Sequence, residues 1–307
     1  MKVQWDGHEL SDWDRDHAQA AAALQQDWAY GSTAVSLGAM VLRARVHADG
    51  VPVAMAQFIM RRFGKLASLA VCTRGPIWQQ PLSGADKAQA YRAIRQSMPV
   101  RGLRFMMVTP DELQGTDHGL PSIRRVMSGA ATVMLDISQA MDTLRANLDK
   151  RWRQPLVSAE KSKLTIHRMG TNPGQYRWLL DAEMKQREDR GLEGMPPVWF
   201  QHYIESRKQP AKSVLLVRAD LGRDRLAAML FLIHGEAATY QVGWTSEAGR
   251  DLHAHHLIMW KGIEELRERG VRMLDLGGIN TARSAGVARF KLATGGEVRI
   301  LTGSYLS

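Results

Sequence analysis

Alternating apolar and polar positions predict a run of β-strands in the first half of the chain. The strands predicted there span residues 41–46, 52–61, 65–71 and 104–108. Between the last two, Ala90, Ile94 and Met98 recur at helical spacing and predict a helix over residues 83–98. Before the strands, residues 10–30 are amphipathic and predict one helix, which begins after Ser11 and ends at Gly31.

The same order of elements returns in the second half of the chain. The strands predicted there span residues 213–219, 225–233, 237–244 and 271–276. A long helix over residues 252–269 precedes the last strand, and its apolar side is made of Leu257, Trp260, Ile263 and Leu266. The agreement in order and spacing predicts a duplicated α/β unit, with one domain over residues 1–135 and a second over residues 136–307.

Helical segments fill most of the region that separates the two sets of strands. A strand is predicted over residues 131–135, followed by helices over 139–152, 174–189 and 198–208. Pro155 is expected to interrupt the first of these helices, because proline lacks the backbone donor and clashes with the preceding turn. A basic run that includes Arg153 and Lys161 surrounds Trp152, a pattern typical either of a phosphate-rich ligand or of a solvated helix face.

Composition narrows the class of protein. The chain has 307 residues, 45% of them hydrophobic, and a formal net charge of +10, which favours polyanionic partners. Cys72 is the single cysteine and lies in an apolar run, so no intrachain disulfide and no cysteine-based metal site can form. The N-terminal residues contain no apolar signal region, and no apolar run reaches about 18 residues. We therefore expect a cytoplasmic protein whose membrane contact, if any, is peripheral.

The stretch Leu274–Glu297 differs most from its counterpart in the first half. It ends a strand at the pair Gly277-Gly278, continues through Asn280 and Arg289-Phe290-Lys291, and closes at a second glycine pair. Paired glycines allow a sharp turn or the close approach of a ligand, and the cation between them suits an anionic ligand. The alternative is two tight turns with an exposed lysine. Because the first-half counterpart has no such glycine pair, we expect a functional site here.

Familiar catalytic motifs are absent from the sequence. It has no metalloprotease, serine-hydrolase, phosphate-loop or calcium-loop signature. His253, His255 and His256 cluster at the start of the long helix but lack an evident third ligand, so we expect no metal site. Residues 246–250, including Arg250, follow a strand and open a helix; they suit either an anion site or an ordinary helix start.

Several of these segments together resemble the Fem-type peptidyltransferases, within the wider GNAT acyltransferase superfamily. The features that carry the resemblance are LQQDWAYG, RGPIW, the basic run KRWRQPLVSAEKSKL, SEAGRDLHAHHLIMWKGIEELRERG, and LDLGGI followed by GVARFKLATGGE. The resemblance implies an α/β (α+β) fold of two tandem GNAT-like domains, each a mixed, mostly antiparallel sheet flanked by helices. The GNAT pyrophosphate loop survives only in degraded form at residues 246–251, which argues against a coenzyme A donor.

The resemblance also implies an activity: transfer of an aminoacyl group from aminoacyl-tRNA to an amine, for example that of a peptidoglycan precursor. The alternatives are an acyl-CoA-dependent N-acyltransferase and a non-catalytic RNA- or lipid-binding protein on the same scaffold. Aminoacyl-tRNA or acyl-CoA would be a co-substrate, and no further cofactor is expected. A lipid-linked acceptor would bring peripheral membrane contact.

The expected chemistry is direct attack of an amine on an ester or thioester, because no cysteine or serine–histidine arrangement supports a covalent intermediate. Lys291 is the predicted oxyanion stabiliser, and Phe290 matches a segment that in the family meets the donor. Asp275 either orients the amine or acts as base, or else holds the glycine turn. Tyr240 and Trp244 are expected to line the cleft, with substrate contacts from the remaining residues of the basic run and the C-terminal stretch.

Overall fold

The computed structural model describes residues 1–307 except 65, 171, 190, 192, 193 and 283. It divides the chain into two compact units, one made of Met1–Ala131 with Arg299–Ser307 and one made of Thr132–Val298. The C-terminal segment belongs to the first unit because β15 (Ser304–Leu306) pairs there with two other strands. The expected division, with residues 136–307 in the second domain, did not assign this C-terminal segment to the first unit.

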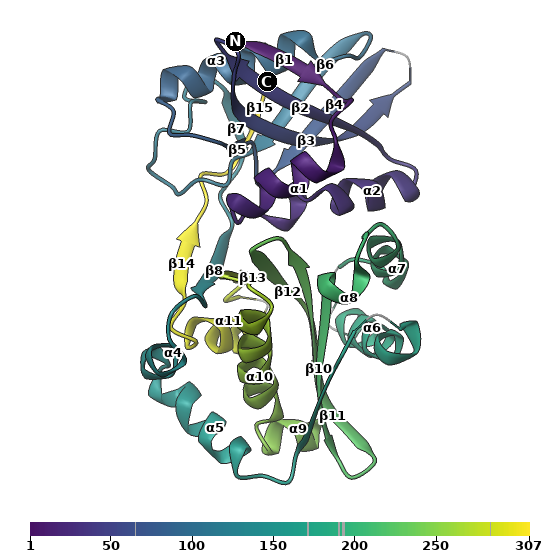
Figure 1. Cartoon of the computed structure of the whole chain (residues 1–307), viewed down its shortest axis with the longest axis vertical. Coiled ribbons are helices and arrows are strands. Elements are labelled where there is room, and N and C mark those ends of the chain that lie inside the picture. Colours follow the sequence, from purple (N-terminus) through teal and green to yellow (C-terminus); the bar gives the residue numbers. More distant parts are fainter. Residues whose placement is uncertain (65, 171, 190, 192–193, 283) are drawn as a thin grey trace. The chain divides into compact units, whose positions relative to one another are not determined.

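The first unit is built on one mixed sheet with the order β1-β2-β3-β4-β6-β15-β7, and β5 pairs with β3 beside this path (Figure 1). Besides β15, its strands are β1 (Lys2–Trp5), β2 (Met40–Ala48), β3 (Val51–Phe63), β4 (Ala67–Thr73), β5 (Ile77–Trp78), β6 (Leu103–Thr109) and β7 (Arg124–Met127). Its helices are α1 (Leu10–Gln19), the 3₁₀ turn η1 (Leu24–Gln26), α2 (Trp28–Ser36) and α3 (Gly84–Ser97).

The second unit is built on a sheet with the order β14-β8-β13-β12-β11-β10-β9. Its strands are β8 (Ala131–Asp136), β9 (Thr165–Met169), β10 (Val214–Leu221), β11 (Asp224–His234), β12 (Ala237–Thr245), β13 (Met273–Gly278) and β14 (Glu297–Ile300). Its helices are α4 (Met141–Asn147), α5 (Lys150–Glu160), α6 (Pro173–Glu188), α7 (Pro197–Glu205), α8 (Pro210–Ser213), α9 (Glu247–Asp251), α10 (Ala254–Glu268) and α11 (Ala285–Leu292).

The two sheets repeat one topology, as the duplicated sequence pattern predicts. Three antiparallel strands, β2-β3-β4 in one unit and β10-β11-β12 in the other, are followed by a helix and by a strand that pairs in parallel with the third. The predicted fold class, two mixed and mostly antiparallel sheets flanked by helices, is confirmed. Strand β4 begins at Ala67; Lys65, where the third predicted strand begins, lies outside the described residues.

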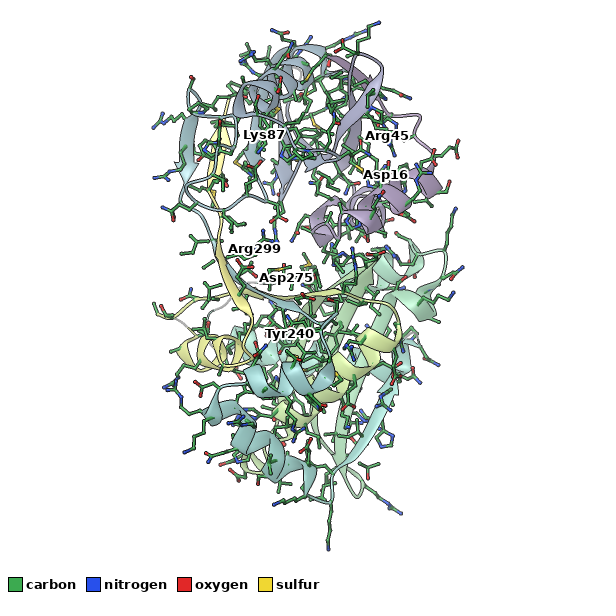
Figure 2. The ribbon with its side chains drawn as sticks, turned by 60° about the vertical axis from the view of Figure 1, so that its left-hand side comes forward. Asp16, Arg45, Lys87, Tyr240, Asp275 and Arg299 are labelled. Atoms are coloured by element: carbon green, nitrogen blue, oxygen red, sulfur yellow. The ribbon has the colours of Figure 1, made fainter. Side chains whose placement is uncertain are left out.

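The single helix predicted over residues 10–30 is wrong. The chain forms α1, a 3₁₀ turn and α2 instead, and Ala21 between them adopts a left-handed conformation with φ 44°. Gly31 lies inside α2 rather than ending it. Glycine is needed there for packing, because a Cβ would lie 2.2 Å from the Gln57 side chain. Helix α1 is tied to β2 by an ion pair of 2.6 Å between Asp16 and Arg45, both labelled in Figure 2.

Two buried glutamines explain the break. The Gln26 side chain accepts a hydrogen bond from the Gln57 backbone N–H at 2.8 Å and donates one to the Thr73 carbonyl at 2.8 Å. Gln57 in turn donates to the Asp27 carbonyl and accepts from Arg43, at 2.9 Å each. These bonds tie the segment between α1 and α2 to β3 and β4 through buried polar groups. A continuous helix would withdraw the Gln26 amide from this network.

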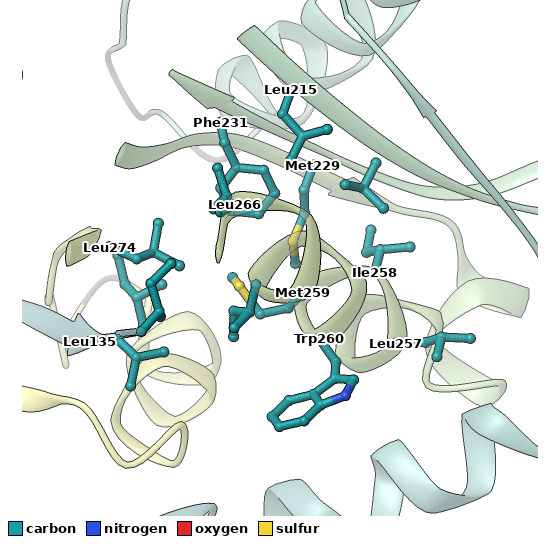
Figure 3. Packing of buried hydrophobic residues seen from close by; sticks show 14 of the residues in the cluster. Leu135, Leu215, Met229, Phe231, Leu257, Ile258, Met259, Trp260, Leu266 and Leu274 are labelled. Carbon is teal, nitrogen blue, oxygen red and sulfur yellow. The ribbon is translucent and has the colours of Figure 1, made fainter. Parts of the chain in front are cut away.

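Helix α10 carries the core of the second unit. The apolar side predicted from Leu257, Trp260, Ile263 and Leu266 is buried, with each side chain at most 5% exposed. Figure 3 shows this helix between strand residues such as Phe231 and the neighbouring helices. Gly262 is required on the helix face toward the sheet, because a Cβ there would lie 2.8 Å from the Phe231 ring. The helix thereby packs directly onto β11.

Other predicted boundaries in the second unit need correction. Pro155 lies within α5 instead of interrupting it, and the helix break falls earlier, at Leu148-Asp149, where the Asp149 carboxylate caps α5 by accepting from the Arg151 N–H. Proline is tolerated because the missing hydrogen bond would join the carbonyl of Arg151, in the exposed first turn. The helix predicted over residues 252–269 begins two residues later, at Ala254 of α10, and His253 with φ 54° separates it from the short helix α9.

Replacing Gln26 by leucine should destabilise the protein by about 1–3 kcal/mol, because the Gln57 N–H and the Thr73 carbonyl lose their buried partner. Urea unfolding of the variant and the parent measures this difference. The matched control is Gln25→Leu, since the Gln25 side-chain oxygen has no hydrogen-bond partner among the described residues. Equal stabilities of the two variants would contradict the role assigned to Gln26.

Candidate active site

Strands β12 and β13 separate at the middle of the second sheet. They pair in parallel only from Ala237 to Thr239 on β12 and from Met273 to Asp275 on β13. Beyond this point β13 keeps its pairing with β8, up to Gly278 opposite Thr132, while β12 continues beside β11. The two strands therefore diverge and leave an opening next to Tyr240.

A β-bulge decides which side chains face this opening. Register between β11 and β12 shifts where Leu230 pairs with Val242 and Phe231 pairs with Tyr240, so Gln241 is the extra residue. Because a bulge adds one residue, Tyr240 and Gly243 both project from the face that packs on α10. Simple alternation would instead have placed Tyr240 and Trp244 on one face.

Trp244 consequently lies on the other face of the sheet. It pairs with Ala228 and packs edge-on against Trp178 of α6, at 5.7 Å between ring centroids. The expectation that Tyr240 and Trp244 line one cleft is met by Tyr240 alone, and the physical reason is the bulge between them.

Lys291 reaches the opening from α11. Its ammonium donates to the Gly278 carbonyl at the end of β13, at 2.9 Å, and lies 5.8 Å from the centre of the Tyr240 ring on β12. Gly277 adopts a left-handed conformation with φ +76°, which favours glycine, and a Cβ there would be in ordinary contact with the amine at 3.5 Å. Lys291 is only 8% exposed, and burial lowers its pKa while Asp275 opposes the shift. Since an ammonium has three donors, two remain for a ligand.

Asp275 is buried and forms hydrogen bonds that hold the glycine turn. One of its carboxylate oxygens accepts from the Thr132 hydroxyl at 2.6 Å and from the Gly277 backbone N–H at 2.7 Å. These bonds favour the turn-holding alternative over direct action on an amine. The carboxylate also supplies the negative charge that supports the Lys291 ammonium.

A cavity of about 880 Å³ lies beside this opening, within the second unit. Strand β12 contributes Tyr240, Gly243 and Thr245 to its wall, and the first turn of α10 contributes His255 and His256. The remaining lining residues come from α5, α6, α9 and the segment of α11: Asp149, Arg151, Trp152, Gln186, Arg250, Ser284, Ala285, Gly286, Val287, Arg289, Phe290, Leu292 and Ala293. Three arginines against a single aspartate give the wall a positive charge.

Aromatic rings form one side of the cavity. Phe290 lies 5.7 Å from Trp152, 5.3 Å from His255 and 5.2 Å from His256, measured between ring centroids. Trp152 Nε1, His255 Nδ1 and His256 Nδ1 are buried atoms without a hydrogen-bond partner among the described residues. Buried polar atoms are normally paired, so these three rings place unpaired polar groups just behind the cavity wall.

The histidines are neutral near pH 7. Burial, followed by the charges of His256 and Arg250, lowers the pKa of His255 to about 3. Burial and the charge of His253 lower the pKa of His256 to about 4. His255 Nε2 lies 3.3 Å from the Tyr240 hydroxyl, whose pKa is raised by burial. His255 and Tyr240 can therefore offer hydrogen bonds to a ligand without carrying charge.

The turn from β12 into α9 is closed by its own side chains. Ser246 caps the helix by accepting from the Gly249 N–H, and Gly249 packs so tightly on β11 that a Cβ would lie 2.3 Å from the Leu226 carbonyl. Helix α9 then ends after five residues, at Asp251. This geometry favours the ordinary-helix-start alternative over a phosphate cradle at residues 246–250, although Arg250 itself lines the cavity.

The structure brings together some of the residues predicted from the sequence and separates others. Phe290, Arg289, Arg250 and Tyr240 line the cavity, and Gly277, Gly278, Lys291 and Asp275 surround its strand opening. Arg153 and Lys161 are exposed on α5 and are not part of the cavity wall. Asn280 is exposed and accepts from the Ala282 N–H, which shapes the turn before α11.

The sequence did not single out most of the cavity-lining residues, among them Arg151, Trp152 and His255. Arg151 and Trp152 belong to the basic run, but the run gave no sign of which members face inward; that depends on the Asp149 cap, which starts α5. His255 was considered only as a metal ligand. Among the described residues no group of three or more metal-binding side chains is present. A buried histidine beside a strand tyrosine would have been the signal to follow.

A family model for the acetyltransferase (GNAT) domain matches residues 138–292, the part of the chain that contains this cavity. The chain belongs to the GNAT acetyltransferase family. It is therefore an acyltransferase, and the opening between β12 and β13 lies within the family's domain. A search of curated proteins found no match to this GNAT protein.

Solved structures share its fold over nearly the whole chain. The structure named FemX aligns with a TM-score of 0.80 at 15% identity, over 99% of this chain and 96% of that one. A tandem GNAT protein from the clavulanic acid biosynthesis pathway aligns with a TM-score of 0.55 at 12% identity, over 100% and 98% of the two chains. The C-terminal domain of a putative lysylphosphatidylglycerol synthetase from Agrobacterium fabrum gives 0.53 at 14% identity, over 97% and 92%. The resemblance to Fem-type and tandem GNAT proteins is confirmed in the fold.

Acidification should destabilise this GNAT protein through His255. Its pKa is near 6.5 when unfolded and about 3 when folded, so the unfolded state binds the proton first as the pH falls. The contribution of neutral His255 to the free energy of unfolding is present above about pH 6.5 and is lost progressively down to about pH 3. Between pH 7 and pH 5 the parent should lose about 1–2 kcal/mol more than His255→Gln in denaturant unfolding. Parallel pH profiles of the two proteins would show that His255 is not held neutral.

Proposed function

We propose that the protein transfers an aminoacyl group from aminoacyl-tRNA to an amine acceptor, with the donor's acyl end at the opening between β12 and β13. The observation that carries this proposal is the Lys291 ammonium, buried at that opening with one protein acceptor, the Gly278 carbonyl. A cation with free donors at the end of a strand suits the developing oxyanion of an ester under attack.

The adjoining cavity supports a donor that carries phosphate and a nucleoside. Arg151, Arg250 and Arg289 supply positive charge along its wall. Phe290 supplies aromatic surface, on which bases stack without strict sequence preference, and the buried Trp152 ring packs against it. The acceptor end of a tRNA combines these features with an ester-linked aminoacyl group.

An acyl-CoA donor is the second candidate, because the chain belongs to a family whose model is named for acetyltransferases. The turn before α9 argues against it. Ser246 already occupies the Gly249 N–H, and the short helix leaves no continuous helix start for a pyrophosphate. We therefore place RNA ahead of coenzyme A as the donor.

The reaction that we propose is direct. The neutral acceptor amine attacks the ester carbonyl carbon, a C–N bond forms, and the carbonyl oxygen gains negative charge near Lys291. The C–O bond to the ribose then breaks, and one amine proton ends on the leaving ribose oxygen. Tyr240, kept protonated by burial, is placed to donate a hydrogen bond to that oxygen when His255 holds its own proton on Nε2.

The acceptor that we propose is the amine of a peptidoglycan precursor peptide. The support is the Fem-type resemblance of the C-terminal stretch and the fold shared with FemX. Asp149, the one carboxylate among the cavity's described lining residues, is placed to meet this amine.

The donor is tested by incubating the purified protein with cell-wall precursors and either labelled aminoacyl-tRNA or labelled acyl-CoA. We expect label to move from the tRNA to the precursor and the transfer to stop when ribonuclease is added first. Movement of the coenzyme A label alone, insensitive to ribonuclease, would overturn the tRNA assignment and establish the second candidate.

Replacing Lys291 by methionine should lower kcat by about 10²–10³-fold, the usual effect of losing one oxyanion donor. The fold should survive, because methionine fills a similar volume and removes a buried charge. Transfer kinetics and unfolding midpoints measure the two effects, and Lys212→Met, on the exposed surface of α8, is the matched control.

Two results would contradict the role of Lys291 as an oxyanion donor. Unchanged kcat in Lys291→Met would remove the lysine from the reaction. Absence of transfer by the parent itself, with RNA or lipid bound equally by both proteins, would favour a non-catalytic binding protein on this scaffold.

A further inference from the structure

One end of the sheet in the first unit exposes large apolar side chains. They lie where β3 ends, where β4 and β6 begin, and at the C-terminus of α2. Leu66 is 80% exposed, Leu103 65%, Phe63 57% and Phe105 41%; Val35 and Leu37 at the end of α2 are also exposed. We call these six side chains the apolar edge.

Backbone pairing makes the central part of the apolar edge continuous. Phe63 pairs with Ala67, which pairs with Leu103, and the Leu103 N–H donates to the Leu66 carbonyl at 2.9 Å. Leu69 pairs with both Arg61 and Phe105. Because directly paired residues share a face of a sheet, Phe63, Leu103 and Phe105 stand on one face together.

In the part of the first unit that the structure describes, no helix buries the side chains at this end of the face. Helix α3 packs on the opposite face, where Met60, Ala70 and Met106 are buried with Ile94. On the side of the apolar edge, α1 and α2 cover the sheet only around Met55 and Gln57. Further along β3 the same face carries Arg61 and Phe63, both exposed. The unit thus leaves hydrophobic side chains uncovered that a monomeric soluble surface rarely groups together.

Arginines surround the apolar edge and lack acidic partners. Arg61, Arg62, Arg101 and Arg104 are exposed, and none of them forms an ion pair with a described carboxylate. Arg104 donates to the Gln96 carbonyl at 2.9 Å, and Arg62 lies 3.6 Å from the Met40 sulfur. Their charges therefore stay available to a ligand outside the protein.

The sequence around the edge is depleted of acids. From Trp28 to Pro110 the chain contains eleven Lys and Arg residues and two acids, Asp49 and Asp86. Asp49 lies in the turn between β2 and β3, at the opposite end of those strands, and Asp86 lies in the first turn of α3. The apolar edge is therefore bounded by one sign of charge.

We propose that the apolar edge and its four arginines dock the protein on an anionic lipid surface. Phe63, Leu66 and Leu103 insert at the level of the headgroups, and the arginines pair with lipid phosphates. Exposed aromatic and leucine side chains flanked by arginine are the combination that binds such an interface. Among the described residues no helix is long and apolar enough to cross a membrane, so the contact is interfacial.

Charge complementarity selects a lipid surface over a second copy of the chain. A symmetric dimer through this edge would bring arginines from both copies together without carboxylates to neutralise them. An anionic bilayer supplies negative charge at every position around the apolar side chains. The inference goes beyond the proposed transfer reaction, and vesicle binding needs neither donor nor acceptor, so either can fail alone.

The experiment is cosedimentation of the full-length protein with phosphatidylcholine vesicles, with and without an equimolar share of phosphatidylglycerol. We expect binding to the anionic vesicles only, weakening as salt is raised. Phe63→Ser with Leu66→Ser should reduce binding about tenfold or more, and so should Arg61→Gln with Arg62→Gln. All four positions are exposed, so the unfolding midpoints should stay close to that of the parent.

The matched control is Leu221→Ser with Arg223→Gln, an exposed leucine and arginine at the turn between β10 and β11 of the second unit. This control should bind vesicles as the parent does. Equal binding by the edge variants and the parent, or an equal loss in the control, would overturn the proposal. A dimer that the edge variants abolish, without vesicle binding by the parent, would assign the edge to a protein interface instead.

Discussion

The site depends on the separation of β12 and β13 and on the lysine that enters between them. Parallel strands normally keep their backbone groups paired along their length, but these two part after Thr239 and Asp275. The Lys291 ammonium then binds the Gly278 carbonyl, and the Asp275 carboxylate holds the turn that exposes this carbonyl. A buried charge is tolerated there because a carboxylate and a carbonyl both favour it.

The duplicated fold makes this arrangement easier to interpret. Both units contain the same three antiparallel strands and the same parallel pair, yet β4 and β6 stay paired from Ala67 with Leu103 to Thr73 with Thr109. The second unit pairs only three residues before its strands diverge. One copy keeps a closed sheet with an apolar edge, whereas the other opens its sheet and builds a charged, aromatic cavity beside the opening.

The sequence was a sound guide to elements whose periodicity is decided locally. The helices with Ala90, Ile94 and Met98 or with Leu257 and Leu266 on one face formed as expected, because burial of one face determines both the period and the position. The duplication also predicted that the two units repeat one order of elements along the chain, as their central strands do. The glycine pair at residues 277–278 marked the end of β13, where the candidate site lies.

Features decided by distant contacts were beyond the sequence. The break after α1 depends on Gln26 meeting β3 and β4, and the displacement of Trp244 from the cleft depends on a bulge at Gln241. The strand β15 returns to the first unit from the end of the chain, and no local pattern announces that pairing. His255 appeared in the sequence as one of three clustered histidines, and only the fold places it beside Tyr240.

The most direct measurement of the central claim is hydrogen–deuterium exchange with and without a short acceptor-stem RNA that carries an amide-linked, non-hydrolysable aminoacyl group. We expect protection over residues 240–256 and 284–293, two segments that line the cavity and the strand opening. We also expect an uncharged stem to protect these segments less, because the aminoacyl end reaches Lys291. Protection confined to other segments, with these two unchanged, would contradict the placement of the donor.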